Sequence, residues 1–169
     1  LKVGVIKNIQ ELDISEDVIN AYEISKTVLS GLGHKLVEVD FSELSSGICS
    51  YYVIAPAECS SNLSRFDGVK YGYRSKGEKD IANLYMNTRS DGFGDEVKKR
   101  ILIGTHVLSA GFYDAYYLQA QKVRRMIKLK FENFFKDVDL IFMPTTLDQA
   151  FEKNRKSDDP NRMYKEDLL

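Results

Sequence analysis

Residues 1–6, Leu-Lys-Val-Gly-Val-Ile, and residues 35–39, Lys-Leu-Val-Glu-Val, are two short β-rich runs that flank one helical segment. Between them, Asp13 and Glu16 have the spacing of a capping box, and apolar residues then recur at helical intervals. A strand–helix–strand segment of this length favours parallel strands joined by a right-handed crossover. Residues 1–40 are therefore predicted to form a βαβ unit, which makes the fold class α/β.

The rest of the chain is predicted to be helical up to one further strand. Helix formers begin at Tyr52 and continue to about Arg65, with Pro56 expected in the first turn of that helix. Three more helices are predicted over about 78–90, 95–109 and 112–136. The organisation is therefore a βαβ unit over 1–40, a mainly helical region over 51–136, a buried strand over 139–144, and a loop with the start of a helix over 145–169.

Composition excludes several classes of protein. The 169 residues are 43% hydrophobic and 29% charged, with a formal net charge of −1, which is typical of one folded globular domain. A nearly neutral chain has no global field that attracts nucleic acid or a membrane surface, and no run of 18 apolar residues predicts a membrane span. Two cysteines and two histidines in separate elements predict neither a disulfide framework nor a metal site.

Arg100 is the cation whose position points to a specific role. In the helix predicted over 95–109, the step of about 100° per residue places Arg100 at the border of the apolar stripe. A guanidinium held against an apolar face requires a carboxylate partner, and its planar fork suits a bidentate one. That partner is either an Asp or Glu of this chain or the carboxylate of a ligand. The basic residues between 122 and 136 are similarly open, either as a solvated face or as a patch for tRNA or an acidic protein.

Four stretches of the chain carry a family resemblance. They are YYVIAPAECSSNLSRFDGVKYGYRS at 51–75, RSDGFGDEVKKRILIGTHVLSAGFYDAYYLQAQKVR at 89–124, MPTT at 143–146 and DDPNRMYKEDLL at 158–169. Together they closely resemble the A subunits of the glutamyl-tRNA(Gln)/aspartyl-tRNA(Asn) amidotransferases, a branch of the amidase signature family. The likeness covers nearly the whole chain, which is therefore identified as a segment from the C-terminal half of a member of that family.

The resemblance implies an α/β/α amidase domain around a mixed sheet, in which a Ser–cis-Ser–Lys triad releases ammonia from glutamine. The ammonia passes to a partner B subunit, which activates the misacylated tRNA with ATP and magnesium, while a small C subunit braces the pair. In the family the triad lies in a glycine- and serine-rich region that precedes the stretch matched here. We therefore expect this segment to contain no catalytic nucleophile, to bind no cofactor or metal itself and to be inactive alone.

The family's glutamine-binding residues match this chain at three positions. They are Tyr51, the first tyrosine of YYVIAPAE, Arg100 in DEVKKRILIGT, and Asp167 in MYKEDLL. The resemblance implies that Arg100 binds the substrate α-carboxylate, Asp167 accepts from its α-ammonium, and Tyr51 adds a hydroxyl contact. The chain departs from the family pattern at Cys59, at Lys70 and over 147–149, where a proline- and threonine-rich continuation is more usual.

Two other functions stay open. The chain could be a non-catalytic α/β module that binds a protein partner, with Tyr51, Arg100 and Asp167 in structural roles. It could also come from another amidase of the same superfamily, acting on a different amide, although a site that recognises both charged ends of an amino acid argues against this. The resemblance implies that the protein lies in the cytoplasm of a bacterium or in the matrix of an organelle, and we expect it not to bind a membrane.

Overall fold

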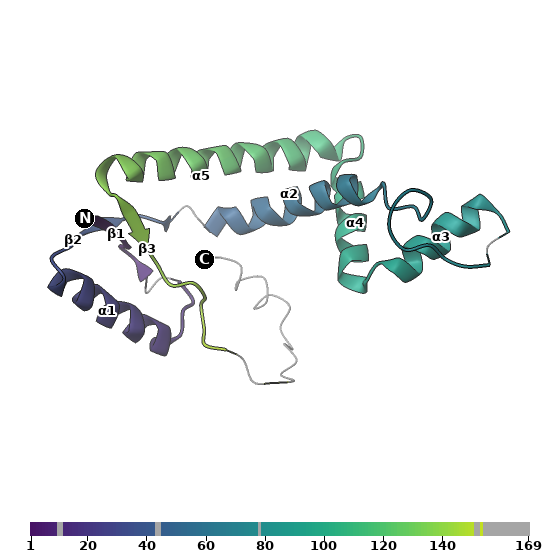
Figure 1. Ribbon diagram of the computed structural model, residues 1–169. Coiled ribbons are helices and arrows are strands. Elements are labelled where there is room, and N and C mark those ends of the chain that lie inside the picture. Colours follow the sequence, from purple (N-terminus) through teal and green to yellow (C-terminus); the bar gives the residue numbers. More distant parts are fainter. Residues whose placement is uncertain (10–11, 43–44, 78, 151–152, 154–169) are drawn as a thin grey trace. The chain divides into compact units, whose positions relative to one another are not determined.

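The computed structural model in Figure 1 describes residues 1–9, 12–42, 45–77, 79–150 and 153. The chain divides into two compact units. Unit 1 comprises residues 1–48 and 123–169, and unit 2 comprises residues 49–122. The assignment of residues 1–169 to one segment of a single domain stays a prediction.

Unit 1 contains a three-stranded parallel sheet. Its strands are β1 (Lys2–Ile6), β2 (Lys35–Val39) and β3 (Leu140–Phe142), in the order β2-β1-β3. Lys2 is in register with Lys35, and both neighbours of β1 run parallel to it. The predicted α/β class is confirmed. The mixed sheet implied by the resemblance needs an antiparallel strand, and the strands within the described ranges are all parallel.

Helices cover both faces of this sheet. The chain passes from β1 to β2 through α1 (Glu16–Gly31) and returns to β3 through α5 (Leu118–Asp137). Because β2 and β3 lie on opposite sides of β1, right-handed crossovers place the two connections on opposite faces. Figure 1 shows α1 on one side of the strands and α5 on the other. The buried cluster between them consists of Val3, Val5, Ile6, Ile9, Ile14, Tyr22, Val39, Phe41 and Leu147.

Tyr22 adds a polar link inside this apolar core. Its hydroxyl accepts a 2.9 Å hydrogen bond from the Ile6 N–H and donates a 3.1 Å bond to the Phe142 carbonyl. Its ring also stacks on Phe142, with the ring centroids 5.2 Å apart. A buried hydroxyl is stable only with such partners, and here they join α1 to the ends of β1 and β3.

The predicted capping box at the start of α1 is wrong. The helix begins at Glu16, and Ser15, not Asp13, occupies the N-cap position without a side-chain cap hydrogen bond. The Ser15 N–H instead donates a 2.9 Å bond to the Leu147 carbonyl, which comes from the loop after β3. This long-range bond fixes the extended backbone at Ser15, so a tertiary contact, not the local pattern, sets the helix start.

Unit 2 is helical, and its first helix, which begins in unit 1, differs from the prediction. α2 (Ser45–Leu63) begins before Tyr51, and Pro56 lies in its interior instead of its first turn. A proline there removes one backbone hydrogen bond and destabilises the helix locally. Ile54, Pro56 and Ala57 are all buried, and this packing outweighs the local cost.

The other helices of unit 2 follow the predicted order. They are α3 (Ile81–Gly92), α4 (Asp95–Val107) and a turn of π-helix, η3 (Tyr113–Tyr117), which leads into α5. Asp80 caps α3 by accepting from the N–H groups of Ala82 and Asn83. None of the helices in the described ranges has both the length and the hydropathy needed to cross a membrane.

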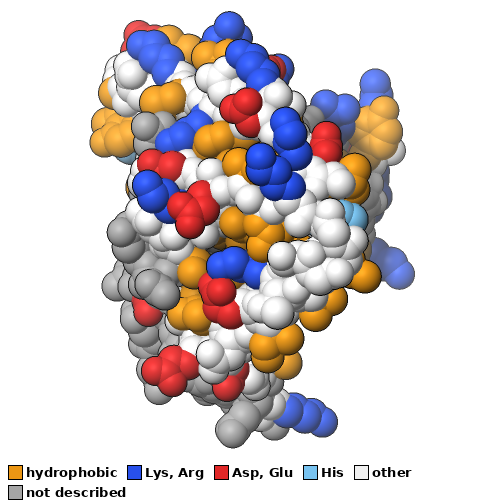
Figure 2. All heavy atoms as spheres, turned by 90° about the vertical axis from the view of Figure 1, so that its left-hand side faces the viewer, with side chains coloured by type: hydrophobic (Ala, Val, Ile, Leu, Met, Phe, Trp, Pro, Cys, Tyr) orange, Lys and Arg blue, Asp and Glu red, His pale blue; other side chains and the backbone are white. Residues whose placement is uncertain are grey.

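The face shown in Figure 2 carries charged side chains of both signs. Acidic and basic side chains are interspersed there with hydrophobic ones. This agrees with the nearly balanced 24 Lys and Arg against 25 Asp and Glu of the whole sequence. On the described part of that face, electrostatic attraction of a polyanion is therefore weak.

Candidate functional site

Tyr51 and Arg100 lie on different helices of unit 2 and contact each other. Arg100 Nη1 donates a 3.3 Å hydrogen bond to the Tyr51 hydroxyl, across a sequence separation of 49 residues. Tyr51, in α2, is 44% exposed, and the Arg100 side chain, in α4, is 31% exposed. The structure thus brings together two of the three residues predicted to bind glutamine. Asp167, the third, lies outside the described residues.

The sequence did not decide which carboxylate pairs with Arg100, and in the structure it is Glu96. Arg100 Nε lies 3.2 Å from Glu96 Oε1, one helical turn earlier in α4. The i,i+4 spacing of the two residues is a local signal that predicts this pair. The hydrogen bond to Tyr51 raises the pKa of Arg100 above its usual range, and the bond to Glu96 acts in the same direction. Arg100 is therefore a permanent cation at physiological pH.

The arrangement still leaves Arg100 able to bind an anion. Among the described residues, Glu96 uses the Nε donor and Tyr51 uses one donor of Nη1. A guanidinium has five N–H donors, so the end of the fork formed by Nη1 and Nη2 keeps donors for a carboxylate. The Tyr51 hydroxyl accepts from Arg100, which leaves its own proton to donate. The pair can thus offer a cation and a neutral hydroxyl to one polar ligand.

Two hydrogen bonds connect α2 to the segment that contains η3 and the start of α5. The Ser50 hydroxyl donates to the Ala120 carbonyl at 2.7 Å, and the Tyr117 hydroxyl donates to Glu58 Oε1 at 2.9 Å. The bond to Glu58 raises the pKa of Tyr117 above its ordinary value, because the carboxylate disfavours a phenolate beside it. These bonds fix the helix that carries Tyr51.

Along α4, the contacts follow one another in sequence order. The pairs are Tyr51 with Arg100, Pro56 with Gly104, and Ser60 with Thr105. The backbone of α2 fills the space beside Gly104. The apolar pattern of one helix does not show which neighbour packs on it, so this contact was not predicted from the sequence.

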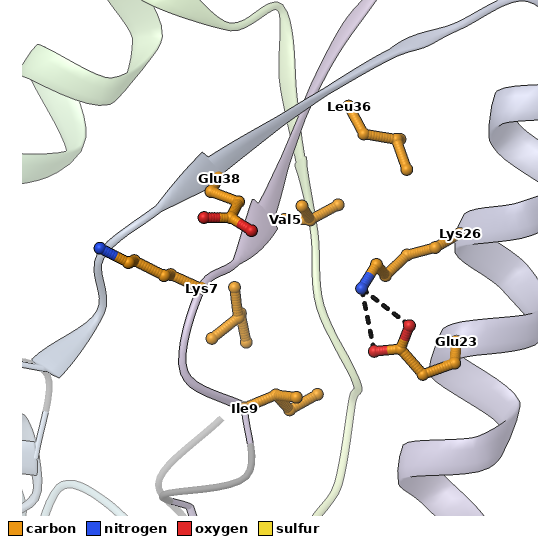
Figure 3. A pocket seen from close by; sticks show the side chains of 8 residues that line it. Val5, Lys7, Ile9, Glu23, Lys26, Leu36 and Glu38 are labelled. Atoms are coloured by element: carbon orange, nitrogen blue, oxygen red, sulfur yellow. Dashed lines mark hydrogen bonds and ion pairs between the residues drawn. The ribbon is translucent and has the colours of Figure 1, made fainter.

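Unit 1 contains a separate cavity of about 360 Å³, shown in Figure 3. It is lined by Val5, Ile6, Lys7, Ile9, Glu23, Lys26, Leu36 and Glu38. In Figure 3 the Lys26 ammonium points at the Glu23 carboxylate, and the two groups are 2.8 Å apart. The two charges of this pair neutralise each other, so the pair adds little net field to the cavity. Tyr51 and Arg100 are not among the residues that line it.

Metal binding has no candidate in the part of the chain that the structure describes. No group of three or more His, Cys, Asp or Glu side chains is close enough there to hold an ion. His106 instead packs against Phe112, with ring centroids 4.2 Å apart. Cys49 is exposed and Cys59 is partly buried, and both are free thiols.

Comparison with known proteins identifies close relatives. The chain is 49% identical over 167 residues to the protein from Hahella chejuensis named as the A subunit of glutamyl-tRNA(Gln) amidotransferase, covering 99% of this chain and 34% of that protein. It is 50% identical over 168 residues to the protein of the same name from Nitrosomonas europaea, covering 99% and 35%. The chain therefore spans about a third of the length of the curated relatives it matches.

A solved structure and a family profile agree with these relatives. The crystal structure of the glutamyl-tRNA(Gln) amidotransferase A subunit from Thermotoga maritima superposes with a TM-score of 0.67 at 35% identity, covering 100% of this chain and 32% of that one. The profile of the family described as Amidase matches residues 1–169, the whole chain. A match over this length shows the family, and the chain accordingly belongs to the amidase family.

Proposed function

We propose that this chain is the part of a tRNA-dependent amidotransferase A subunit that recognises glutamine. The observation that carries the proposal is the Tyr51–Arg100 contact, in a chain about half identical to glutamyl-tRNA(Gln) amidotransferase A subunits along nearly its whole length. The reaction of such a protein is the hydrolysis of glutamine to glutamate and ammonia. Water supplies the oxygen that replaces the amide nitrogen.

Each proposed residue has a defined contact with the substrate. The open end of the Arg100 fork binds the α-carboxylate of glutamine, and the Tyr51 hydroxyl donates a further hydrogen bond. By the family motif, Asp167 accepts from the α-ammonium group. A site that pairs both charged ends discriminates against simple amides, because an amide lacking one end loses the hydrogen bonds that this end makes with the site.

The bond-breaking step belongs to residues outside this chain. We place no nucleophile within the 169 residues, since the Ser–cis-Ser–Lys triad of the family lies in a region preceding the matched stretch. In this proposal the chain holds glutamine in place and the triad attacks its side-chain amide. Holding a substrate in the reactive geometry is itself a large catalytic contribution.

The proposal includes a multi-subunit complex. A partner B subunit receives the ammonia and uses ATP and magnesium to activate the misacylated tRNA, either Glu-tRNA(Gln) or Asp-tRNA(Asn), and a small C subunit braces the two. ATP and magnesium therefore bind the partner and not this chain. The names of the relatives support the assignment to an amidotransferase of glutamyl-tRNA(Gln).

The variant Arg100→Lys in the complete three-subunit complex tests the proposal. Lysine keeps the positive charge but loses the bidentate fork, so hydrogen bonds to the charged substrate carboxylate weaken. We expect glutamine-dependent transamidation to fall about 10- to 100-fold, as for the loss of one hydrogen bond to a charged group. Ammonia-dependent transamidation, which bypasses glutamine binding, should stay unchanged. Lys99→Arg, on the exposed side of the same helix, is the matched control.

Other outcomes would favour the alternative functions. Equal activity of Arg100→Lys and wild type with both nitrogen donors would make Arg100 a structural ion pair, as expected for a protein-interaction module. Hydrolysis of simple amides without use of glutamine would indicate another amidase of the superfamily. Loss of activity with both donors, together with loss of complex assembly, would show a structural defect.

A further inference from the structure

Helices α2 and α4 approach each other most closely at Gly104. A Cβ atom built on this buried glycine would overlap the carbonyl oxygen of Pro56 and lie 2.7 Å from Ser60 Cβ. The Pro56 oxygen belongs to the backbone, so it cannot move away without the helix. A glycine Cα–H that faces a carbonyl oxygen is a weakly attractive contact found between closely packed helices. The glycine therefore permits a separation that any larger residue would prevent.

This close contact lies one helical turn from the Tyr51–Arg100 hydrogen bond. Arg100 precedes Gly104 by four residues in α4, and Tyr51 precedes Pro56 by five residues in α2. The distance from Arg100 Nη1 to the Tyr51 hydroxyl is 3.3 Å, slightly beyond the usual range of about 2.7–3.2 Å for N–H···O hydrogen bonds. A small outward shift of α4 would therefore break the bond.

The Arg100 guanidinium moves with α4 and not with α2. Its ion pair with Glu96 lies within α4, so it is preserved when the helix shifts as a body. A hydrogen bond to Tyr51 connects the guanidinium to α2. The separation of the two helices consequently affects the distance between the cation and the hydroxyl.

We propose that Gly104 is a positioning residue, which sets the separation of α2 and α4 so that Arg100 and Tyr51 bind the same substrate molecule. The proposal rests on the proposed glutamine site and assigns it a specificity determinant that touches no substrate. A larger residue at position 104 separates the fork from the hydroxyl, so glutamine binds with fewer simultaneous contacts. The triad and the partner subunits are not altered by such a change.

A hydrogen bond one residue further along supports the same separation. Thr105 Oγ1 donates to the Ile101 carbonyl at 2.8 Å, so in the 2.9 Å contact with Ser60 Oγ it serves as the acceptor. Removing this acceptor weakens the tie between the helices without adding volume. Thr105→Val therefore perturbs the same spacing more gently than a substitution of Gly104.

The test is Gly104→Ala in the complete three-subunit complex, with KM and kcat measured for glutamine and for ammonia. We expect the KM for glutamine to rise about tenfold or more, since small misplacement of a substrate contact can cost up to about 100-fold. The kcat with ammonia should stay at the wild-type value. Gly94→Ala is the matched control, because it lies at the N-cap of the same helix and its added Cβ meets nothing within 4 Å.

Parallel variants separate failure of this proposal from failure of the glutamine site. If Arg100→Lys impairs use of glutamine while Gly104→Ala leaves its KM unchanged, the positioning role is wrong and the site stands. If Gly104→Ala prevents assembly of the complex, the glutamine KM of Thr105→Val tests the positioning role instead. A rise of about two- to tenfold in its glutamine KM, as for one neutral hydrogen bond, supports the proposal. An unchanged KM for Thr105→Val overturns it.

Discussion

Unit 1 and unit 2 differ in the contacts that join their helices and strands. The buried cluster of unit 1 joins a parallel sheet to the helices on its two faces through branched aliphatic and aromatic side chains. In unit 2, hydrogen bonds such as Tyr117 to Glu58 and the glycine contact at Gly104 join one helix to the next. The strength of apolar packing depends mainly on the volume and area that are buried, whereas the strength of a hydrogen bond or a close backbone contact depends on the exact positions of its atoms. The predicted binding pair, Tyr51 and Arg100, lies in unit 2, where contacts of the second kind join the helices.

This difference gives a physical reason for the predicted binding pair to lie in the helical unit. Cores tolerate hydrophobic rearrangement when the total volume is kept, and they lose geometric uniqueness before they lose stability. A substrate contact needs a side chain held to within a fraction of an ångström. In the contact of Pro56 with Gly104 the facing atom belongs to the backbone, so it cannot move without its helix. Such a contact is suited to holding Arg100 beside Tyr51.

The largest expected effect is in the core of unit 1. Phe41 is 5% exposed, and its ring contacts those of Phe131 and Phe134. We expect Phe41→Ala to lower the free energy of unfolding by about 3–5 kcal/mol, because it removes buried surface and leaves a cavity. Phe135→Ala, on the exposed side of α5, is the control and should change it by less than about 0.5 kcal/mol. Urea unfolding of the purified protein measures both; equal effects would contradict an apolar core in unit 1.

Gly68→Ala tests the position-dependent contacts of unit 2. Gly68 has φ +76, and an added Cβ would lie 2.7 Å from Thr88 Cγ2. The hydroxyl of the same Thr88 accepts a hydrogen bond from the Ser75 N–H. Backbone strain and overpacking together should cost about 2–4 kcal/mol. Gly77, with φ +83 and nothing within 4 Å of its built Cβ, separates the two causes. Gly77→Ala should show the strain alone, about 1–2 kcal/mol. Equal losses in thermal unfolding would show that the close approach to Thr88 is unimportant.

A smaller effect than that of Gly68→Ala concerns the polar contact within the apolar unit. Tyr22→Phe keeps the ring but leaves the buried Ile6 N–H without its acceptor. The expected loss is about 1–3 kcal/mol in the free energy of unfolding, the cost of an unsatisfied buried donor. Urea unfolding at neutral pH measures this loss. A neutral effect would mean that apolar packing alone stabilises unit 1, which would sharpen the contrast between the units.

Tyr22 also predicts a pH dependence. Burial raises the pKa of Tyr22 above its ordinary value of 10.0, because a phenolate is poorly solvated there. The folded state thus binds the hydroxyl proton more tightly than the unfolded state. Its contribution to stability is complete below pH 10.0 and is lost as the pH rises through the higher pKa of the folded state. The difference in unfolding free energy between wild type and Tyr22→Phe should therefore shrink as the pH rises above 10.0. A difference that stays constant would contradict the raised pKa of Tyr22.

The sequence was informative wherever the contacts are local or the apolar pattern is periodic. The two runs at 1–6 and 35–39 predicted the βαβ unit, because strand alternation and crossover handedness follow from backbone geometry. The position of Arg100 at the border of an apolar stripe predicted a paired cation, and Glu96 is that partner at i,i+4 spacing. The family likeness was readable from motifs, and the comparisons confirm it.

Other features were decided by tertiary structure alone. The start of α1 depends on the bond from Ser15 to Leu147, and the burial of Pro56 inside α2 depends on packing, neither of which is visible in a local window. The contact of Gly104 with Pro56 joins residues far apart in the chain, and one helix's pattern does not name its neighbour. Sequence determined which helices form and which of their residues carry charge. Only the packing of α2 against α4 determined that Tyr51 and Arg100 meet, because their distance depends on the separation of two backbones.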